Sequence, residues 1–168
     1  MNWQFKNIEN VQTGEVKAGG ADMILVASAI GSCVAVVAID AKKLVGGIAH
    51  IMLPGKALSC DSESPITRYA ENGFRELLNL IHGKGARKED LTICIAGAAN
   101  VLMDADDTLC RENIDSVLRL CDAFGFAVKA RSLGGFKRRK ISLDIEKCRI
   151  LCAIGDGPEF ILWDNAKG

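Results

Sequence analysis

Short apolar runs of strand length recur along this chain and constrain its fold more than any other feature. Residues 33–39 and 45–53 are apolar on both faces, as expected of strands that are covered on both sides. Further runs predict strands at 23–26, 91–96, 126–132, 140–145 and 148–154, and the apolar tail 160–163 is expected to dock onto the rest of the protein. The pattern predicts a protein built mainly from strands.

Two amphipathic segments interrupt the strands. Ser64-Pro65 is typical of a helix start, with serine as N-cap and proline at the first position, and Gly83 is a stop signal. A second helix is expected over 111–124, capped by Gly125. The predicted inward residues are Ile66, Tyr69, Phe74, Leu77 and Ile81 in the first helix and Ile114, Val117, Leu118, Cys121 and Phe124 in the second.

This order of elements predicts the α/β class, with mixed sheets and helices packed outside. A length of 168 residues suits one domain, so we expect a single domain over 1–168, with an N-terminal arm at 1–13 and a C-terminal tail at 155–168. Gly97 to Asn100 is a turn of small residues, which predicts a close approach of the backbone to another segment.

Composition argues against several classes of protein. Lys plus Arg equals Asp plus Glu at 21 each, which gives no reason to expect a nucleic-acid partner. The first 20 residues lack the apolar stretch of a signal peptide, and no run reaches the roughly 18 apolar residues of a membrane helix. We therefore expect a cytoplasmic protein that is not inserted in a membrane.

The 7 cysteines are an odd number, are widely spread and form no CxxC pair. Cys94, Cys121, Cys148 and Cys152 lie among apolar residues and are expected to be buried thiols rather than disulfides. With only 2 histidines and no close Cys/His cluster, the chain predicts no structural zinc site.

The connection from Asp40 to Lys43 is short enough for a hairpin. If the turn centres between Ala41 and Lys42, Cys33 lies directly opposite His50, with Cβ atoms about 4.5–5.5 Å apart. A shift of one residue would send the two side chains to different faces, so the pairing depends on the register.

A thiol beside an imidazole indicates nucleophilic catalysis, since the histidine can take the thiol proton. Gly31 and Ser32 leave an open approach, where backbone N–H groups could face a developing oxyanion. The structural alternatives are a cysteine that only packs and a histidine satisfied within the core. His82 follows a helix and is explained by a dipole contact at the C-terminus.

Three other polar features have simpler interpretations. The aspartates at 104, 106 and 107 lack the spacing of a calcium loop and are read as a solvated loop. Gly134-Gly135 has no helix after it, which argues against a phosphate-binding loop. The basic run 137–140 is interpreted as a solvated loop, with a contact to an acidic helix of a partner protein as the alternative.

Two motifs carry a family resemblance. Gly31-Ser32-Cys33-Val34 and the stretch from Gly46 to Pro54 resemble the paired signatures of CheD, the chemoreceptor glutamine deamidases. Supporting motifs follow in the same order over roughly 14–154: Gly14-Glu15-Val16, the Tyr69 helix, the Gly97 turn, the Asn113 helix and the segment from Gly134 to Lys140.

The resemblance implies a protein-glutamine glutaminase of chemotaxis, an amide hydrolase without a cofactor. Its substrates would be glutamine side chains of methyl-accepting receptors, its nucleophile Cys33 and its base His50, with a thioester intermediate. A CheC-like phosphatase is the second implied partner. The implied fold is a β-sandwich with helices on both outer faces.

One position departs from the family pattern. Ala27 stands six residues before Cys33, where the family usually has a threonine that orients the histidine. Ser28 is adjacent, but strand alternation would point it to the other face. Either a backbone carbonyl orients His50, or activity is reduced, or the chain is a non-catalytic regulator that binds receptors or a CheC-like phosphatase. A thiol peptidase is a third alternative.

Overall fold

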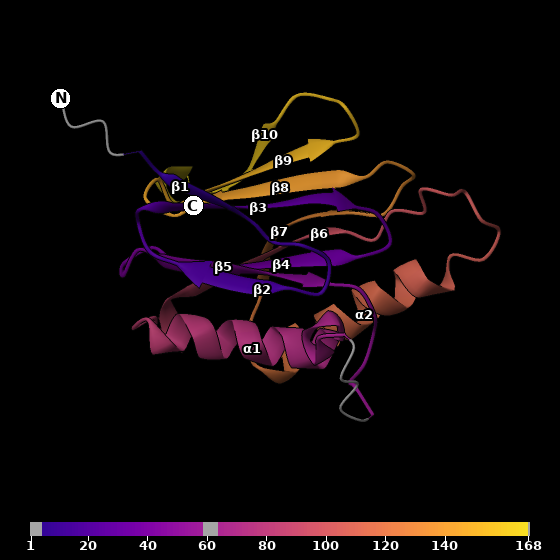
Figure 1. Cartoon of the computed structure of the whole chain (residues 1–168), viewed down its shortest axis with the longest axis horizontal. Coiled ribbons are helices and arrows are strands. Elements are labelled where there is room, and N and C mark those ends of the chain that lie inside the picture. Colours follow the sequence, from indigo (N-terminus) through magenta and orange to yellow (C-terminus); the bar gives the residue numbers. More distant parts are fainter. Residues whose placement is uncertain (1–4, 59–63, 168) are drawn as a thin grey trace.

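Two five-stranded sheets form the centre of the protein (Figure 1). The computed structural model describes residues 5–58 and 64–167. The first sheet has the strand order β1 (Asn7–Asn10), β3 (Met23–Ile30), β8 (Arg139–Asp144), β9 (Arg149–Ile154) and β10 (Phe160–Asp164). The second has the order β2 (Val16–Gly19), β5 (Val45–Ile51), β4 (Val34–Asp40), β6 (Leu91–Gly97) and β7 (Val128–Leu133). Both sheets are mixed, because β1 pairs parallel to β3 and β6 parallel to β7.

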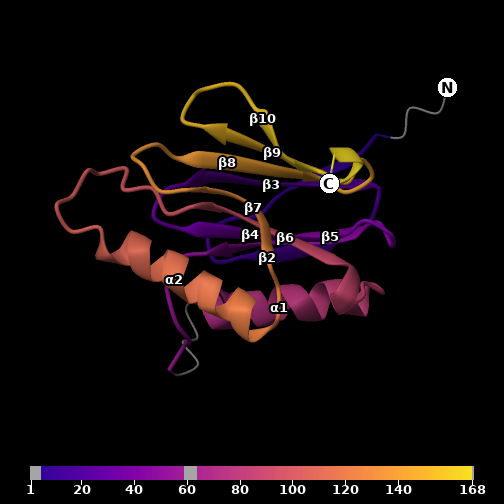
Figure 2. The same cartoon turned by 180° about the vertical axis from the view of Figure 1, so that it is seen from behind.

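Both α-helices of the described residues, α1 (Ala70–Gly83) and α2 (Thr108–Ala123), lie on the outer face of the second sheet (Figure 2). The α/β class and the sandwich-like core are thus confirmed, but the expectation of helices on both outer faces is wrong. The burial patterns explain why. Every residue of β4 and β5 is buried, which requires cover on both faces, whereas β8 alternates buried and open positions and leaves one face of its sheet to solvent.

Two apolar cores result from this layering. Between the sheets, alternate residues of β4 such as Ala35 and Val37 pack against Leu25 and Ile141 of the first sheet. On the other side, Val34 and the remaining alternate residues of β4 and β5 pack against the helices. Strand alternation in the fully buried β4 and β5 therefore decides which side chains face the first sheet and which face the helices.

The hairpin of β4 and β5 has a register different from the one predicted. Ala35 pairs with His50 and Asp40 with Val45, so Cys33 does not lie directly opposite His50. The turn has four residues and centres between Lys42 and Lys43, one position later than expected, which shifts every pair by two. A shift of two preserves the face of each side chain. Cys33 and His50 therefore stay on the same side of the sheet, as diagonal neighbours.

Asp40 sets that turn and should contribute strongly to stability. Its buried carboxylate accepts hydrogen bonds from the backbone N–H groups of Lys42 at 3.0 Å, Lys43 at 3.1 Å and Arg87 at 3.0 Å. Asp40→Ala should lower the free energy of unfolding by about 3 kcal/mol, because three donors lose their acceptor. Asp40→Asn, which keeps one acceptor oxygen, should lose less. Urea unfolding measures both, and a loss below about 1 kcal/mol for Asp40→Ala would contradict this role.

Most predicted elements are present, with shifted ends. The expected strands at 23–26, 91–96, 126–132, 140–145 and 148–154 correspond to β3, β6, β7, β8 and β9, and the apolar tail docks as β10. The helix start at Ser64-Pro65 is wrong: a 3-10 turn, Ile66–Arg68, follows Pro65, and α1 begins at Ala70. The sequence pattern missed β1 and β2.

None of the helices within 5–58 and 64–167 has the length and apolar character needed to cross a bilayer.

Candidate active site

Cys33 lies at the end of a tight loop directly before β4, half-buried against the core between the sheets. Three consecutive carbonyl groups of this loop are held by hydrogen bonds. Ala99 N–H donates to Gly31 O at 2.8 Å and Ala98 N–H to Cys33 O at 2.7 Å. The carbonyl between them, of Ser32, accepts from the side-chain amide of Asn113 at 2.9 Å. The loop that carries the thiol is therefore fixed by both β6 and α2.

The backbone around this loop is strained. Ala29 and Ala98 have φ values of 53° and 52°, in the left-handed region that non-glycine residues rarely adopt. Gly97 has φ 127°, and a Cβ there would lie 2.2 Å from Cys33 O, which confirms the predicted close approach of this turn. Gly31 differs, since a Cβ would meet only Val101 at an ordinary 3.5 Å. Such strain is common at active sites.

His50 lies in the middle of the sandwich and is oriented by a backbone carbonyl. It pairs with Ala35 and is 1% exposed. Its Nδ1 lies 3.1 Å from Val11 O. A carbonyl oxygen only accepts, so Nδ1 carries the hydrogen and Nε2 keeps a lone pair. Nε2 has no hydrogen-bond partner within the described chain and can serve as a base.

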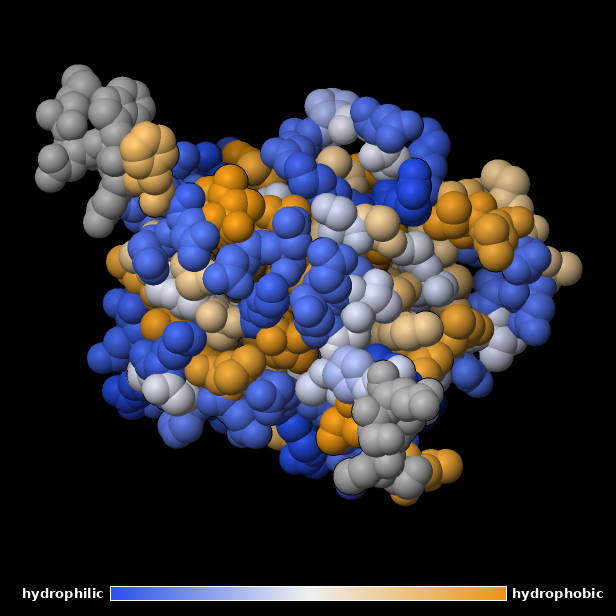
Figure 3. Space-filling view, in the orientation of Figure 1, coloured by the Kyte–Doolittle hydropathy of each residue, from blue (hydrophilic) through white to orange (hydrophobic). Residues whose placement is uncertain are grey.

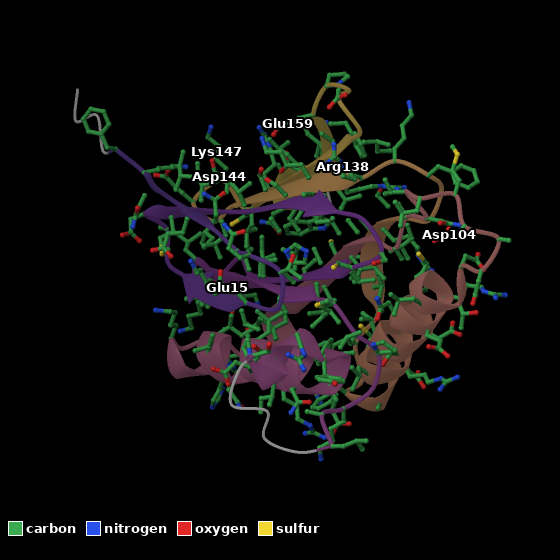
Figure 4. The ribbon with its side chains drawn as sticks, turned by 45° about the vertical axis from the view of Figure 1, so that its right-hand side comes forward. Glu15, Asp104, Arg138, Asp144, Lys147 and Glu159 are labelled. Carbon is green, nitrogen blue, oxygen red and sulfur yellow. The ribbon has the colours of Figure 1, made fainter. Side chains whose placement is uncertain are left out.

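The segment from Val11 to Glu15 folds over His50. Gly14 N–H donates to His50 O at 2.8 Å, and His50 N–H donates to Glu15 O at 3.0 Å. Figure 4 labels Glu15 beside the strands of the second sheet. Val11 also donates its N–H to Val26 O at 2.8 Å, next to Ala27. A backbone carbonyl therefore lies against His50, as one of the alternatives raised by Ala27 expects.

Ala27 is fully buried toward the core, and Ser28 is exposed on the outer face of the first sheet. The prediction that alternation points Ser28 away is confirmed. A bulge in the pairing of β3 with β8 follows directly, between Ala27 and Ile30. Bulges of this kind often redirect a strand beside an active site.

Burial keeps both members of the pair neutral at rest. Burial raises the pKa of the Cys33 thiol, opposed by its own backbone N–H. Burial also lowers the pKa of His50, opposed by the hydrogen bond to Val11. The thiol and the imidazole make no hydrogen bond in this geometry, since Nε2 is unpartnered among the residues described. Catalytic contacts often tighten only when substrate binds.

The lowered pKa of His50 predicts the acid limb of any activity that uses it as a base. His50 must be neutral to accept a proton, and its pKa lies below the ordinary 6.5. Half of the activity should therefore be lost only below pH 6.5, where protonation removes the base. A profile of kcat/KM against pH measures this, and half-loss of activity above pH 7 would contradict it. His82→Gln, at the exposed end of α1, is the control.

A hollow opens beside the Cys33 loop. Ser32, Asn100 and Cys110 line it, together with the loop that leads into α2. This loop carries Leu102 at 82% and Met103 at 69% exposed. Phe136, 58% exposed, follows Gly135, whose carbonyl accepts from Asn100 N–H of the same loop at 2.9 Å. Figure 3 shows apolar surface at the end of the molecule where this loop projects, and Figure 4 labels Asp104 there. A partner could contact apolar side chains close to the thiol.

The remaining predicted features are structural. Asp104 N–H bonds to Asn100 Oδ1 at 3.1 Å, and Asp106 accepts from the backbone of Thr108 at 2.9 Å, so these residues order the loop before α2. No group of three His, Cys, Asp or Glu within the described ranges could hold a metal ion. In the basic run 137–140, Arg139 is buried and donates to the carbonyl of Lys137, which corrects its reading as a wholly solvated loop.

The predicted cysteine burial is confirmed. Cys94, Cys121, Cys148 and Cys152 are all buried. Cys110, in the first turn of α2, is also buried. Among the described cysteines, Cys33 is therefore the most exposed thiol.

Because a thiol and an imidazole lie on one face of the second sheet, the fold offers a candidate site for a thiol-dependent hydrolase. Comparison with known proteins then assigns the family: the description "CheD chemotactic sensory transduction" matches residues 52–153. The chain belongs to the CheD family. The matched segment begins two residues after His50, so this comparison alone does not include the candidate pair.

Relatives extend the likeness to nearly the whole chain. A protein of Chlorobium luteolum described as a probable chemoreceptor glutamine deamidase is 36% identical over 90% of this chain and 75% of its own length. The chemoreceptor glutamine deamidases of Halalkalibacterium halodurans and Thermotoga maritima are 31% and 29% identical, over 80% and 81% of this chain and 90% and 85% of their own lengths. A match over 90% of the chain spans Cys33 and His50, whichever end it leaves out.

Sequence reasoning assigned no role to two residues of the site: Val11, which contacts His50, and Asn113, which contacts the Cys33 loop. Val11 acts through its carbonyl, which no side-chain pattern reveals. Asn113 is fully buried, and its signal is a polar amide within the buried positions Cys110, Val117 and Cys121 of α2. A polar residue on an otherwise apolar helix face needs a partner, and here the partners are loop carbonyls.

Proposed function

We propose that this chain is a cytoplasmic protein-glutamine glutaminase that deamidates glutamine side chains of methyl-accepting chemotaxis receptors. The observation that carries the proposal is the orientation of His50: its Nδ1–H is held by Val11 O, while Nε2, on the face shared with Cys33, has no partner among the described residues. The relatives named as chemoreceptor glutamine deamidases supply the substrate class.

The reaction follows from these groups. The Cys33 thiol gives its proton to His50 Nε2 as the sulfur attacks the amide carbon, forming the C–S bond. The C–N bond then breaks, the nitrogen takes the proton from His50, and ammonia leaves. Water attacks the thioester with His50 as base, the C–S bond breaks, and glutamate and the thiol result. Gly31 and Ser32 are proposed to border the oxyanion, on a loop whose carbonyls are already engaged.

The neutral resting pair has a mechanistic consequence. A thiol whose pKa is raised by burial is not a preformed thiolate, so proton transfer to His50 accompanies attack instead of preceding it. Attack by the sulfur therefore needs His50 as base. A receptor helix docked on Leu102, Met103 and Phe136 would hold its glutamine near the thiol.

The test is mass spectrometry of a receptor cytoplasmic fragment incubated with the protein. Each converted glutamine adds about one dalton, and peptide cleavage would instead indicate a thiol peptidase. Conversion by the wild type and its loss in Cys33→Ala support the proposal. An unchanged fragment would reject it.

The second candidate is a non-catalytic regulator that binds receptors or a CheC-like phosphatase. Ala27 favours it, because the buried methyl group cannot hydrogen-bond to the histidine. This candidate expects receptor binding without any gain in mass, and binding that does not change in His50→Gln. A pull-down with a CheC-like phosphatase, done beside the deamidation assay, separates the two roles.

A further inference from the structure

Asn113 holds together the two strand ends that carry Cys33 and His50. Its side-chain Nδ2 donates to Ser32 O at 2.9 Å and to Met52 O at 3.1 Å. Ser32 directly precedes Cys33, and Met52 comes two residues after His50. The amide orientation is unambiguous, because both partners are carbonyl oxygens and only the NH₂ group can donate to them.

The position of these bonds matters. The paired residues of β4 and β5 end at Val34 and Ile51, so Ser32 and Met52 lie just beyond the last pair. Beyond that last pair, the side-chain amide of Asn113 in α2 bridges the segment before β4 and the segment after β5. These two bonds therefore link the backbone next to Cys33 to the backbone after His50, from a helix on the other face of the sheet.

The chemistry of the site makes a purely stabilising role a poor explanation. Asn113 is fully buried, and its Oδ1 has no partner among the described residues. An unpaired buried acceptor is unfavourable and offsets part of what the two donated bonds contribute. The clear gain is geometric, because without the amide the carbonyls of this loop keep, among the described residues, the bonds from Ala98 and Ala99 directly after β6.

We infer that Asn113 is a positioning residue that sets the distance from Cys33 to His50 by joining the carbonyls of Ser32 and Met52. The inference rests on the proposed function of this pair. Asn113 does not touch the reacting atoms and acts through the backbone on either side of them. Misplacement of a reacting group by about 1 Å can cost a hundredfold in rate.

The experiment compares Asn113→Ala and Asn113→Asp with Val117→Ala, a control one turn further along α2 that removes core packing without touching the loop. Receptor deamidation gives kcat and KM, and iodoacetamide gives the alkylation rate of Cys33. Asn113→Ala should lower kcat roughly 10- to 100-fold with little change in KM, and should slow Cys33 alkylation. Val117→Ala should lower Tm but leave both rates near those of the wild type.

Asn113→Asp adds a pH signature that a merely structural role would not give. An ionised carboxylate cannot donate to the two carbonyls, whereas its protonated form can donate to one. Alkylation of Cys33 relative to the wild type should therefore recover as the pH falls.

Three results would overturn the inference: folded Asn113→Ala with kcat and alkylation within twofold of the wild type, a loss in Val117→Ala as large as that in Asn113→Ala, or both Asn113 variants failing to fold. Failure of the proposed function looks different. Wild-type protein would then leave the receptor unchanged, while the alkylation comparison still reports on Asn113.

Discussion

Replacing Cys33 with alanine should reduce receptor deamidation by at least about a thousandfold, because it removes the sulfur that forms the proposed thioester. His50→Ala should reduce kcat by about a hundredfold to ten-thousandfold, the usual contribution of a general base. The double variant should be no worse than Cys33→Ala, since the two residues act in one step.

The matched controls are available in the chain. His82→Gln removes the other histidine, at the exposed end of α1, and Cys110→Ala removes a neighbouring thiol at the start of α2. Neither should lower kcat more than twofold. Initial rates on a receptor fragment measure all of these variants. Activity retained in Cys33→Ala, or a large loss in His82→Gln, would contradict the assignment.

Gly97→Ala should be the most damaging single methyl group that can be added near the site. The new Cβ would lie 2.2 Å from Cys33 O and 2.6 Å from the Ile30 side chain, at a φ of 127° that L residues rarely adopt. Strain and overpacking each cost about 1–3 kcal/mol, so we expect a loss of roughly 3–5 kcal/mol in unfolding free energy. Displacement of Cys33 should also lower kcat at least about a hundredfold in the folded fraction.

Gly83→Ala is the matched control, since a Cβ at this last residue of α1 meets nothing within 4 Å. It should be neutral or stabilise by up to about 1 kcal/mol, as alanine favours helices over glycine. Urea unfolding and deamidation rates compare the two. Equal stability of the two variants would show that the close approach at Gly97 is not a constraint.

The hairpin shows how far sequence reasoning reaches. Two apolar runs joined by a short polar connection were enough to predict that β4 and β5 pair and that Cys33 and His50 share a face. The register was wrong because the turn spans Ala41 to Leu44, fixed by the Asp40 carboxylate and a left-handed Leu44. A register error of two residues leaves each side chain on the same face of the sheet, so Cys33 and His50 were still predicted on one face.

The N-terminal segment shows where sequence reasoning ends. β1 has the sequence Asn-Ile-Glu-Asn and lies at a sheet edge, largely exposed, so it carries no alternating apolar pattern. Its continuation brings Val11 O to His50 only through tertiary pairing with β3. A backbone acceptor has no residue-type signature. The loss of threonine at Ala27 could therefore be noticed in the sequence, but its replacement could not be found there.

The helices illustrate a different limit. The inward faces of α1 and α2 were predicted from their spacing, and Phe74, Leu77, Val117 and Cys121 are buried as expected. The prediction is wrong for Ile66, which is 39% exposed and lies in the 3-10 turn before α1. The choice of sheet was not predictable from the helices alone. It follows from the strands: fully buried β4 and β5 need cover, and the alternating β8 does not.

The most direct test of the central claim is the rate of iodoacetamide alkylation at Cys33, read by peptide mass across pH 5 to 9 in wild type, His50→Gln and His82→Gln. We predict that Cys33 reacts faster than the buried Cys94, Cys121, Cys148 and Cys152. His50→Gln should slow the alkylation of Cys33 at least about tenfold near pH 7.5, whereas His82→Gln should not. A Cys33 that reacts as slowly as these buried thiols, or at the same rate without His50, would contradict it.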